Sequence, residues 1–190
     1  MRLIVGLGNP GAQYDNTPHN VGFHAIDTLA QRHGAQWTVE RRFDAMTTDI
    51  NIGGQKLTLM KPLTYMNLSG RAVAAWRSKN GGEPHEILAI SDDVHLPMGQ
   101  LRLRPGGSHG GQKGLLSMIN SLGTLEFPRL RIGVRPTGGA IVDMVSYVLG
   151  RVKPADRAAF EQSWEAAADA VEDLVKDGMD ATMNRTNRKK

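Results

Sequence analysis

The chain of 190 residues contains no cysteine, and this absence excludes several kinds of chemistry. Without thiols the protein can form no disulfide, can use no cysteine nucleophile and can bind no metal through thiolate ligands. Freedom from cysteine also suits a reducing compartment, so we expect a cytoplasmic protein.

Long apolar runs are also missing. No stretch approaches the roughly 20 residues that a membrane-spanning helix needs, and the first residues lack the basic, apolar and cleavage regions of a signal peptide. The contents of 40% hydrophobic and 22% charged residues are those of an ordinary globular protein. We therefore expect one folded domain with a hydrophobic core and no membrane association.

The chain has little net charge, but the charge is unevenly distributed. The formal net charge is only +4. Residues 94–135 carry six basic residues against the single acidic Glu126, whereas residues 154–184 carry eight acidic residues against two basic ones. The last six residues, 185–190, include four basic ones. A local basic segment of this kind favours a polyanionic partner such as nucleic acid.

Apolar periodicity and turn residues predict alternating strands and helices. A single α/β domain over residues 1–184, with a mixed twisted β-sheet flanked by helices, is the expected fold, followed by a flexible basic tail at 185–190. The expected strands are 3–7, a hairpin within 43–61, 87–90 ending at Ser91-Asp92-Asp93, 100–104 and 130–134; the expected helices are 20–33, 67–79, 114–121 and 154–177.

Two glycine patterns suggest nucleotide binding. Residues 6–11 (GLGNPG) satisfy G-x-G-x-x-G after a strand, but a dinucleotide site also needs a helix directly behind the loop, and here the helix comes about ten residues later. Residues 106–114 (GGSHGGQKG) lack the Gly-Lys-Ser/Thr ending of a phosphate-binding loop. That second loop remains either a ligand-binding lid or a plain surface connection.

Polar residues gather where an α/β sheet usually binds ligands, at or beyond the ends of strands. They are Asn9, His19-Asn20, Asn67 and Asp92-Asp93. A histidine oriented by a carboxylate is a standard general base, and asparagines can donate to a developing oxyanion. Turn formation and helix capping explain the same asparagines equally well. The six histidines show no metal-ligand spacing, so we expect no metal and no other cofactor.

Taken in order, several motifs resemble the bacterial peptidyl-tRNA hydrolase family. They are GLGNPG at 6–11, Tyr14, the TPHNVG segment at 17–22, MNLSG at 66–70, Asp92-Asp93 with LPMG at 96–99, the glycine-rich loop with Lys113-Gly114, and LRIG at 130–133. Each motif is modest, but their order and spacing are specific and span nearly the whole chain.

The resemblance implies an enzyme that cleaves the ester between a peptide and the 3′-terminal ribose of tRNA. It implies His19 as the general base and Asp92 as the partner that orients it. Substrate-binding roles are implied for Asn9, Asn67 and Lys113, with Tyr14 and Met66 as walls of the cleft. The family is typically a cytoplasmic, metal-free monomer. Its partner would be the acceptor stem and 3′ end of peptidyl-tRNA.

The chain departs from the family pattern at two places. Pro18 stands where the family usually has arginine, which removes a charge and a backbone donor beside His19. Gln112-Lys113 replaces His-Asn in the motif that opens the third helix. Lysine donates hydrogen bonds but cannot accept them, so Lys113 could bind substrate but could not hold a water as acceptor.

The resemblance also implies where the tRNA would lie. Arg102 and Arg104 alternate with leucines and should leave the same face of a strand, with Arg131 nearby, to contact phosphates. A solvated strand face is the alternative. Residues 140–149 would form a lid over the cleft or a packed helix. Two other functions remain open, namely a non-catalytic RNA-binding relative and, with less support, a dinucleotide-dependent oxidoreductase.

Overall fold

A computed structural model describes residues 1–138 and 140–188. Within these residues, seven strands form one sheet in the order β2-β3-β4-β1-β5-β7-β6. The strands are β1 (Leu3–Gly6), β2 (Thr38–Glu40), β3 (Ala45–Ile52), β4 (Gln55–Pro62), β5 (Ile87–Pro97), β6 (Leu101–Arg104) and β7 (Arg129–Arg135).

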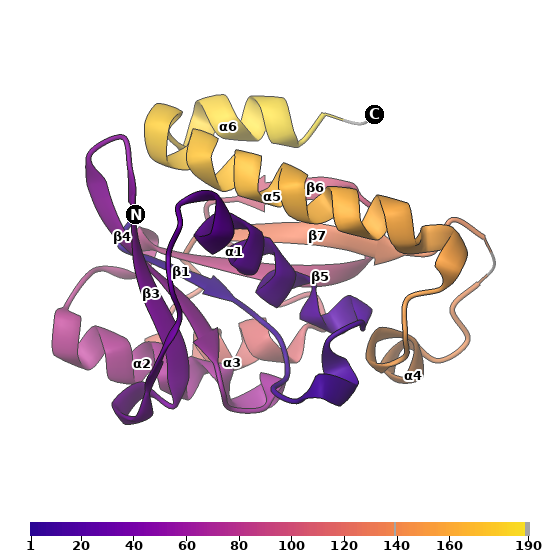
Figure 1. Ribbon diagram of the computed structural model, residues 1–190, viewed down its shortest axis with the longest axis horizontal. Coiled ribbons are helices and arrows are strands. Elements are labelled where there is room, and N and C mark those ends of the chain that lie inside the picture. Colours follow the sequence, from indigo (N-terminus) through magenta and orange to yellow (C-terminus); the bar gives the residue numbers. More distant parts are fainter. Residues whose placement is uncertain (139, 189–190) are drawn as a thin grey trace.

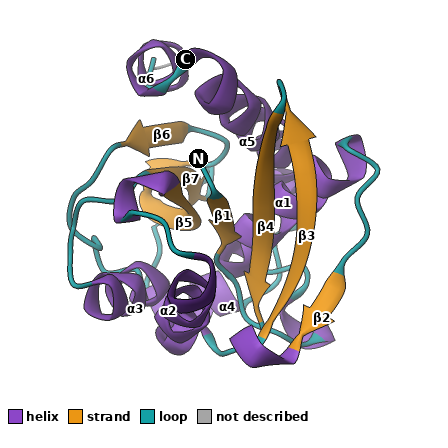
Figure 2. Cartoon of the chain, turned by 90° about the vertical axis from the view of Figure 1, so that its left-hand side faces the viewer, coloured by secondary structure: helices purple, strands orange, loops and turns teal. Residues whose placement is uncertain are grey.

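The sheet is mixed, as the sequence predicted. Strands β4, β1, β5 and β7 run parallel, while β2, β3 and β6 pair antiparallel with their neighbours. The predicted hairpin is β3–β4, which turns at Gly53-Gly54; its two strands lie side by side in Figure 2. Because β1 and β5 are parallel neighbours and Gly6 pairs with Ile90, residues that follow β1 lie beside the part of β5 that follows Ile90.

Helices cover both faces of the sheet, which makes three layers (Figure 1). The α-helices are α1 (Val21–Arg32), α2 (Ser69–Asn80), α3 (Lys113–Leu122), α4 (Met144–Leu149), α5 (Arg157–Asp177) and α6 (Met179–Thr186). One core packs α1 and α5 on residues such as Ile4. The other packs α2 and α3 on Leu3 and Val5. Alternation along β1 thus supplies both cores.

Short 3₁₀ helices connect several of these elements. They are η1 (Ala12–Tyr14), η2 (Pro18–Asn20), η3 (Arg41–Phe43), η4 (Met66–Leu68), η5 (Pro84–Glu86) and η6 (Pro154–Asp156). The predicted helix from Pro154 therefore begins as η6 and continues as α5, whose Phe160 is buried as predicted. Three of these turns, η1, η2 and η4, carry predicted site residues.

The glycines of the GLGNPG segment allow close packing of β1 against α1. A Cβ atom on Gly6 would lie 2.3 Å from the carbonyl oxygen of Gly22, and one on Gly22 would lie 2.6 Å from the backbone nitrogen of Leu7. These distances are too short for any side chain, so both positions require glycine. Between this segment and α1 lie only the short 3₁₀ helices η1 and η2, so no α-helix begins directly behind the loop to receive a pyrophosphate.

Strand β5 is longer than the sequence predicted. The expected end at Ser91-Asp92-Asp93 is wrong, because β5 continues to Pro97 and pairs with β7 through Asp93 and again at Pro97 after a register shift. The polar residues were interpreted as a loop because the apolar run ends at Ile90. Pairing with β7 keeps them in the sheet, where Asp92 and Asp93 are buried.

The predicted tail begins too early. Helix α6 continues to Thr186, and Arg185 forms ion pairs with Asp173 and Asp177 of α5. Asn187 then binds β6, because its amide oxygen accepts from the backbone nitrogen of Leu103 at 2.7 Å and its amide nitrogen donates to the carbonyl of the same residue at 3.0 Å. The acidic face of α5 therefore holds part of the basic segment. Residues 189 and 190 lie outside the described residues.

Helix α4 lies beyond the carboxyl ends of the parallel strands (Figure 1). Asp143 caps it by accepting from the backbone nitrogens of Val145 and Ser146, and the Ser146 hydroxyl bond lowers the pKa of Asp143. Tyr147 donates to the carbonyl of Val134 at 2.6 Å, which anchors α4 to the end of β7. Among the described helices, none has the length and hydropathy needed to cross a bilayer.

Candidate active site

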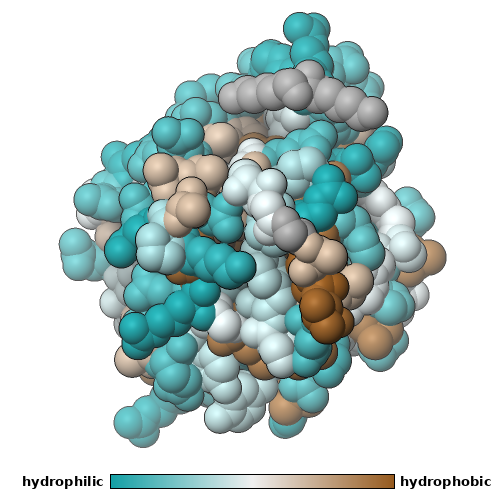
Figure 3. Space-filling model, turned by 90° about the vertical axis from the view of Figure 1, so that its right-hand side faces the viewer, coloured by the Kyte–Doolittle hydropathy of each residue, from teal (hydrophilic) through white to brown (hydrophobic). Residues whose placement is uncertain are grey.

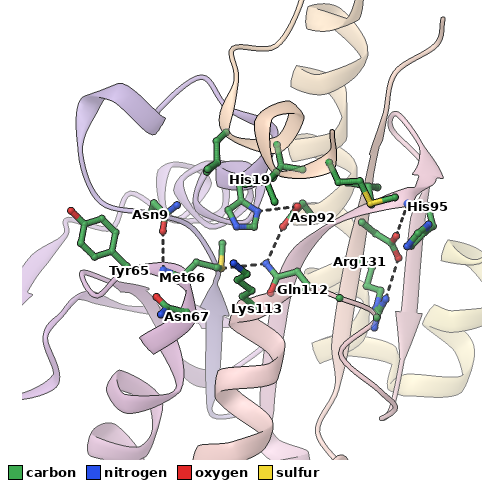
Figure 4. A pocket seen from close by; sticks show the side chains of 18 residues that line it. Asn9, His19, Tyr65, Met66, Asn67, Asp92, His95, Gln112, Lys113 and Arg131 are labelled. Carbon is green, nitrogen blue, oxygen red and sulfur yellow. Dashed lines mark hydrogen bonds and ion pairs between the residues drawn. The ribbon is translucent and has the colours of Figure 1, made fainter. Parts of the chain in front are cut away.

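A cavity of about 450 Å³ opens at the carboxyl end of the parallel strands. Its wall is built from the loop after β1, η2, η4, the end of β5, the start of α3 and Arg131 of β7, with α4 on the outer side (Figure 4). The predicted site residues that line it are Asn9, His19, Met66, Asn67, Asp92, Lys113 and Arg131. Residues as far apart in the sequence as Asn9 and Leu149 therefore share one site.

His19 and Asp92 form the central pair. The Nδ1 atom of His19 lies 3.0 Å from Oδ2 of Asp92, and the side chains are only 12% and 5% exposed. Because a carboxylate accepts, Nδ1 carries the proton, and the other ring nitrogen of a neutral imidazole keeps its lone pair. That arrangement is the one that a general base requires.

Pro18 fits the turn that presents His19. It occupies the first turn of η2, where a backbone N–H would have no partner within the helix. Its fixed φ angle suits the helical conformation at this position. The substitution of the family's arginine therefore removes a charge but leaves the backbone support of His19 in place.

Gln112 holds the second oxygen of Asp92, a contact that the sequence analysis missed. The Nε2 atom of Gln112 donates to Oδ1 of Asp92 at 3.0 Å. The same side chain caps α3, because its Oε1 accepts from the backbone nitrogen of Leu115 at 2.8 Å. The position immediately before the predicted helix was the available signal, since N-cap side chains are oriented by the helix start.

Asn9 is fixed by two other residues. Asn20 binds the backbone of Asn9 twice, accepting from its nitrogen at 2.8 Å and donating to its carbonyl at 2.9 Å. The side-chain oxygen of Asn9 accepts from the backbone nitrogen of Met66 at 2.8 Å. Asn20 occupies the N-cap position of α1, as the capping interpretation expected, but its side chain makes no cap hydrogen bond to the helix and binds Asn9 instead. Among the described residues no acceptor binds the Asn9 Nδ2 group, which leaves a donor at the cavity.

Turn η4 supplies the opposite wall. Met66 is buried with its sulfur 3.2 Å from Nε2 of Gln112, while Asn67 is exposed at the cavity. Tyr65 lines the rim and is 58% exposed. The predicted wall residue Tyr14 does not line this cavity; it lies in η1, where its carbonyl accepts from Thr17 Oγ1 at 2.8 Å. Tyr65 is thus the tyrosine of the cavity wall.

Lys113 is the first residue of α3 and is exposed on the rim. On the outer side the cavity is apolar, because Met144, Val145, Val148 and Leu149 of α4 line it. The predicted lid segment is therefore a helix that borders the cavity. Figure 3 views this end of the molecule, where apolar surface interrupts a mostly hydrophilic one.

Arg131 is largely occupied by contacts within the protein. Its Nη1 pairs with Asp93 at 3.2 Å, and its Nη2 donates to the carbonyl of Ser108 at 2.6 Å. Arg129, which is fully buried, donates to the carbonyls of Gly107 and Ser108. Burial and the neighbouring Arg131 lower the pKa of Arg129 to about 10. The two arginines anchor the glycine-rich loop to β7.

Arg102 and Arg104 lie outside the cavity, on the exposed edge strand β6. Their register partners on β7 are Arg131 and Arg129, so all four side chains leave the same face of the sheet. The same-face prediction for Arg102 and Arg104 is confirmed. Together they form a basic surface beside the cavity.

No group of three or more histidine, aspartate or glutamate side chains suited to a metal ion occurs within residues 1–138 and 140–188.

A matching family model, two sequence relatives and one solved structure all indicate the same family. The family model described as peptidyl-tRNA hydrolase matches residues 3–190. The peptidyl-tRNA hydrolase of Chloroflexus aggregans is 48% identical over 188 residues, which cover 98% of this chain and 99% of the relative. That of Syntrophomonas wolfei is 45% identical over 188 residues, which cover 98% of this chain and 100% of the relative. A crystal structure of peptidyl-tRNA hydrolase from Acinetobacter baumannii is similar with a TM-score of 0.92 at 33% identity, covering 100% of this chain and 96% of that one.

Proposed function

This chain belongs to the peptidyl-tRNA hydrolase family, and we propose that it hydrolyses the ester that joins a peptide to the 3′-terminal ribose of tRNA. One observation carries the proposal, namely that Asp92 orients His19 inside a cavity beside a basic surface. An ester needs only an activated water and a stabilised oxyanion, because its alkoxide leaves more readily than an amine.

His19 acts as the general base. Its free ring nitrogen removes a proton from a water molecule, and the water oxygen attacks the ester carbonyl carbon. Asp92 stabilises the imidazolium that forms. The tetrahedral intermediate then collapses, the bond to the 3′ oxygen breaks, and the imidazolium returns its proton to that oxygen. The products are a peptide carboxylic acid and tRNA with a free 3′ hydroxyl.

Asn9 and Lys113 stabilise the negative charge that develops on the carbonyl oxygen. The Asn9 oxygen accepts from the backbone of Met66, and this bond sets the orientation in which the side-chain N–H₂ group is available as a donor. Lys113 adds a cation at the rim. Such donors are most effective when they are fixed before the reaction, and Asn20 fixes Asn9 in this way.

The peptide and the tRNA occupy different sides of the site. Asn67, with Met66 and Tyr65 as walls, binds the peptide. Arg102 and Arg104 bind phosphates of the acceptor stem, because both guanidinium groups are exposed next to the cavity. Arg131 lies between them and the cavity and mainly supports the glycine-rich loop. We infer a metal-independent, cytoplasmic monomer.

The test is an ester-hydrolysis assay with purified protein and an N-acetylated aminoacyl-tRNA that carries a radiolabelled amino acid. We expect release of the labelled acid, with turnover unchanged by EDTA. The same aminoacyl-tRNA without the N-acetyl group serves as a comparison substrate. Intact ester after incubation with folded protein that still binds tRNA would favour a non-catalytic RNA-binding protein instead.

A further inference from the structure

We propose that Gln112 is a positioning residue that holds the Asp92 carboxylate and thereby aims His19. The inference rests on the proposed hydrolysis and concerns how its base is kept in place. Asp92 is bound on both oxygens, by His19 at Oδ2 and by Gln112 at Oδ1, each at 3.0 Å (Figure 4). Rotation of the carboxylate would break both bonds at once.

The orientation of the Gln112 amide is fixed by α3. Its Oε1 accepts from the backbone nitrogen of Leu115, which leaves Nε2 as the end that faces Asp92. A flipped amide would place its oxygen against a carboxylate oxygen and its N–H₂ group against another donor, so the observed orientation is the only satisfied one. The helix cap therefore connects Asp92 to a regular helix on the other side of the cavity.

In this arrangement the amide nitrogen of Gln112 is engaged by two partners and its oxygen already accepts one hydrogen bond. One N–H group is directed to Asp92 and the nitrogen also lies 3.2 Å from the sulfur of Met66, while the oxygen binds Leu115. The side chain is buried, at 8% exposure. Although Gln112 lines the cavity, its contacts are thus those of a support rather than of a substrate ligand.

A neutral donor suits this position. An amide binds the carboxylate without neutralising it, so Asp92 keeps its full charge for the imidazolium of His19. A lysine or arginine in the same place would compete with His19 for that charge. The other charged or titratable groups that line the cavity are Tyr65, Asp93, His95, Lys113 and Arg131, and Asp93 is already paired with Arg131.

The experiment separates the two roles of Gln112, namely capping α3 and donating a hydrogen bond to Asp92. Gln112→Ser keeps a good N-cap residue but is too short to reach Asp92, and Gln112→His supplies a ring N–H of similar reach but a poorer cap. We expect Gln112→Ser to lower kcat about 10- to 100-fold, the typical effect of losing a hydrogen bond to a charged group, with KM within about twofold of wild type. Gln112→His should recover most of the lost kcat. The matched control is Gln55→Ser on the exposed end of β4, with kcat unchanged.

The same substitution made in a protein that lacks the Asp92 carboxylate tests whether Gln112 acts through Asp92. In an Asp92→Ala protein, we expect Gln112→Ser to cause no further loss of kcat, because the group that it positions is gone. An equal loss of kcat in the wild-type and Asp92→Ala proteins, or a raised KM with unchanged kcat, would overturn the inference.

Thermal unfolding of each variant identifies any folding defect. If Gln112→Ser unfolds, Gln112→Glu keeps the capping oxygen and is expected to show the same loss of kcat. Wild-type protein that hydrolyses no ester would overturn the proposed function itself, and this inference with it.

Discussion

His19 and Asp92 are 73 residues apart in sequence, and yet Nδ1 of the histidine lies 3.0 Å from Oδ2 of the aspartate. The contact exists because η2 follows β1 and because β5 runs parallel to β1 at its side. Asp92 therefore lies in β5 itself, and His19 lies in the η2 turn of the segment that connects β1 to α1. A base held in this way needs no movement of the backbone before it can accept a proton.

The first prediction concerns this base. Replacing His19 by alanine should lower kcat/KM by about 10²–10⁴-fold, the range that a general base contributes. Binding of deacylated tRNA should persist, because the proposed phosphate-binding residues Arg102 and Arg104 lie outside the cavity. The measurements are ester hydrolysis and a filter-binding titration. His85→Ala, an exposed histidine of η5, is the matched control, and activity retained in His19→Ala would exclude His19 as the base.

The second prediction concerns the donor at Asn9. Asn9→Asp keeps an oxygen for the backbone nitrogen of Met66 but replaces the N–H₂ group by a second acceptor. We expect kcat to fall by about 10²–10³-fold, as on loss of one oxyanion donor. Asn51→Asp is a close control, since its side-chain oxygen also accepts from a backbone nitrogen, that of Gly54, in an exposed turn. Equal kcat for Asn9→Asp and wild type would show that Asn9 makes no such contact.

Local patterns in the sequence were sufficient to predict most of the fold. The apolar runs of β1 and β7, the alternation in β3 and β4 and the helical stripe that includes Phe160 each follow from neighbouring residues. The end of β5 did not, because Ser91–Asp93 is polar and stays in the sheet only by pairing with β7. The predicted start of the tail was also wrong because of a tertiary contact, since Arg185 is held by the carboxylates of Asp173 and Asp177 in α5.

Most residues of the candidate site and the pairing of His19 with Asp92 were predicted, but Tyr14 was wrongly placed in the cavity wall and other contacts were missed. His19, Asp92, Asn9 and Asn67 share one cavity, as expected from their places at the ends of strands and helices. The bond from Gln112 to Asp92 could not be predicted, because it depends on which side chains of distant segments face one another. The pairing of Arg131 with Asp93 is of the same kind.

The third prediction concerns the basic surface on β6. Arg102→Ala and Arg104→Ala should each weaken tRNA binding and reduce the slope of log affinity against log salt by about 1. KM should rise and kcat should change little, since neither side chain lines the cavity. Titrations at several salt concentrations provide the measurement. Arg41→Ala, exposed in η3 after β2 at the opposite edge of the sheet, should leave the slope unchanged; an equal effect there would show that binding is non-specific.

The fourth prediction concerns stability and the histidine that anchors the loop before η2. His24 of α1 donates from Nε2 to the carbonyl of Asp15 and stacks on Trp164 with ring centroids 4.2 Å apart. Burial lowers the pKa of His24 below its ordinary value of 6.5, although the bond to Asp15 and the charge of Asp27 act in the opposite direction. The folded protein therefore resists taking up a proton that the unfolded chain accepts.

The sign of the effect follows from that difference. Above pH 6.5 His24 is mostly neutral in both the folded and the unfolded chain, so its titration does not lower the free energy of unfolding. Below pH 6.5 the unfolded chain binds a proton first, so the free energy of unfolding falls with pH, by at most about 1.4 kcal/mol per pH unit, until the folded form is protonated too. Chemical unfolding at pH 7.5 and 5.5 should show a larger loss for wild type than for His24→Phe, which keeps the stacking and cannot titrate. His85→Phe should lose as much as wild type, and an equal loss in His24→Phe would exclude His24 as the source.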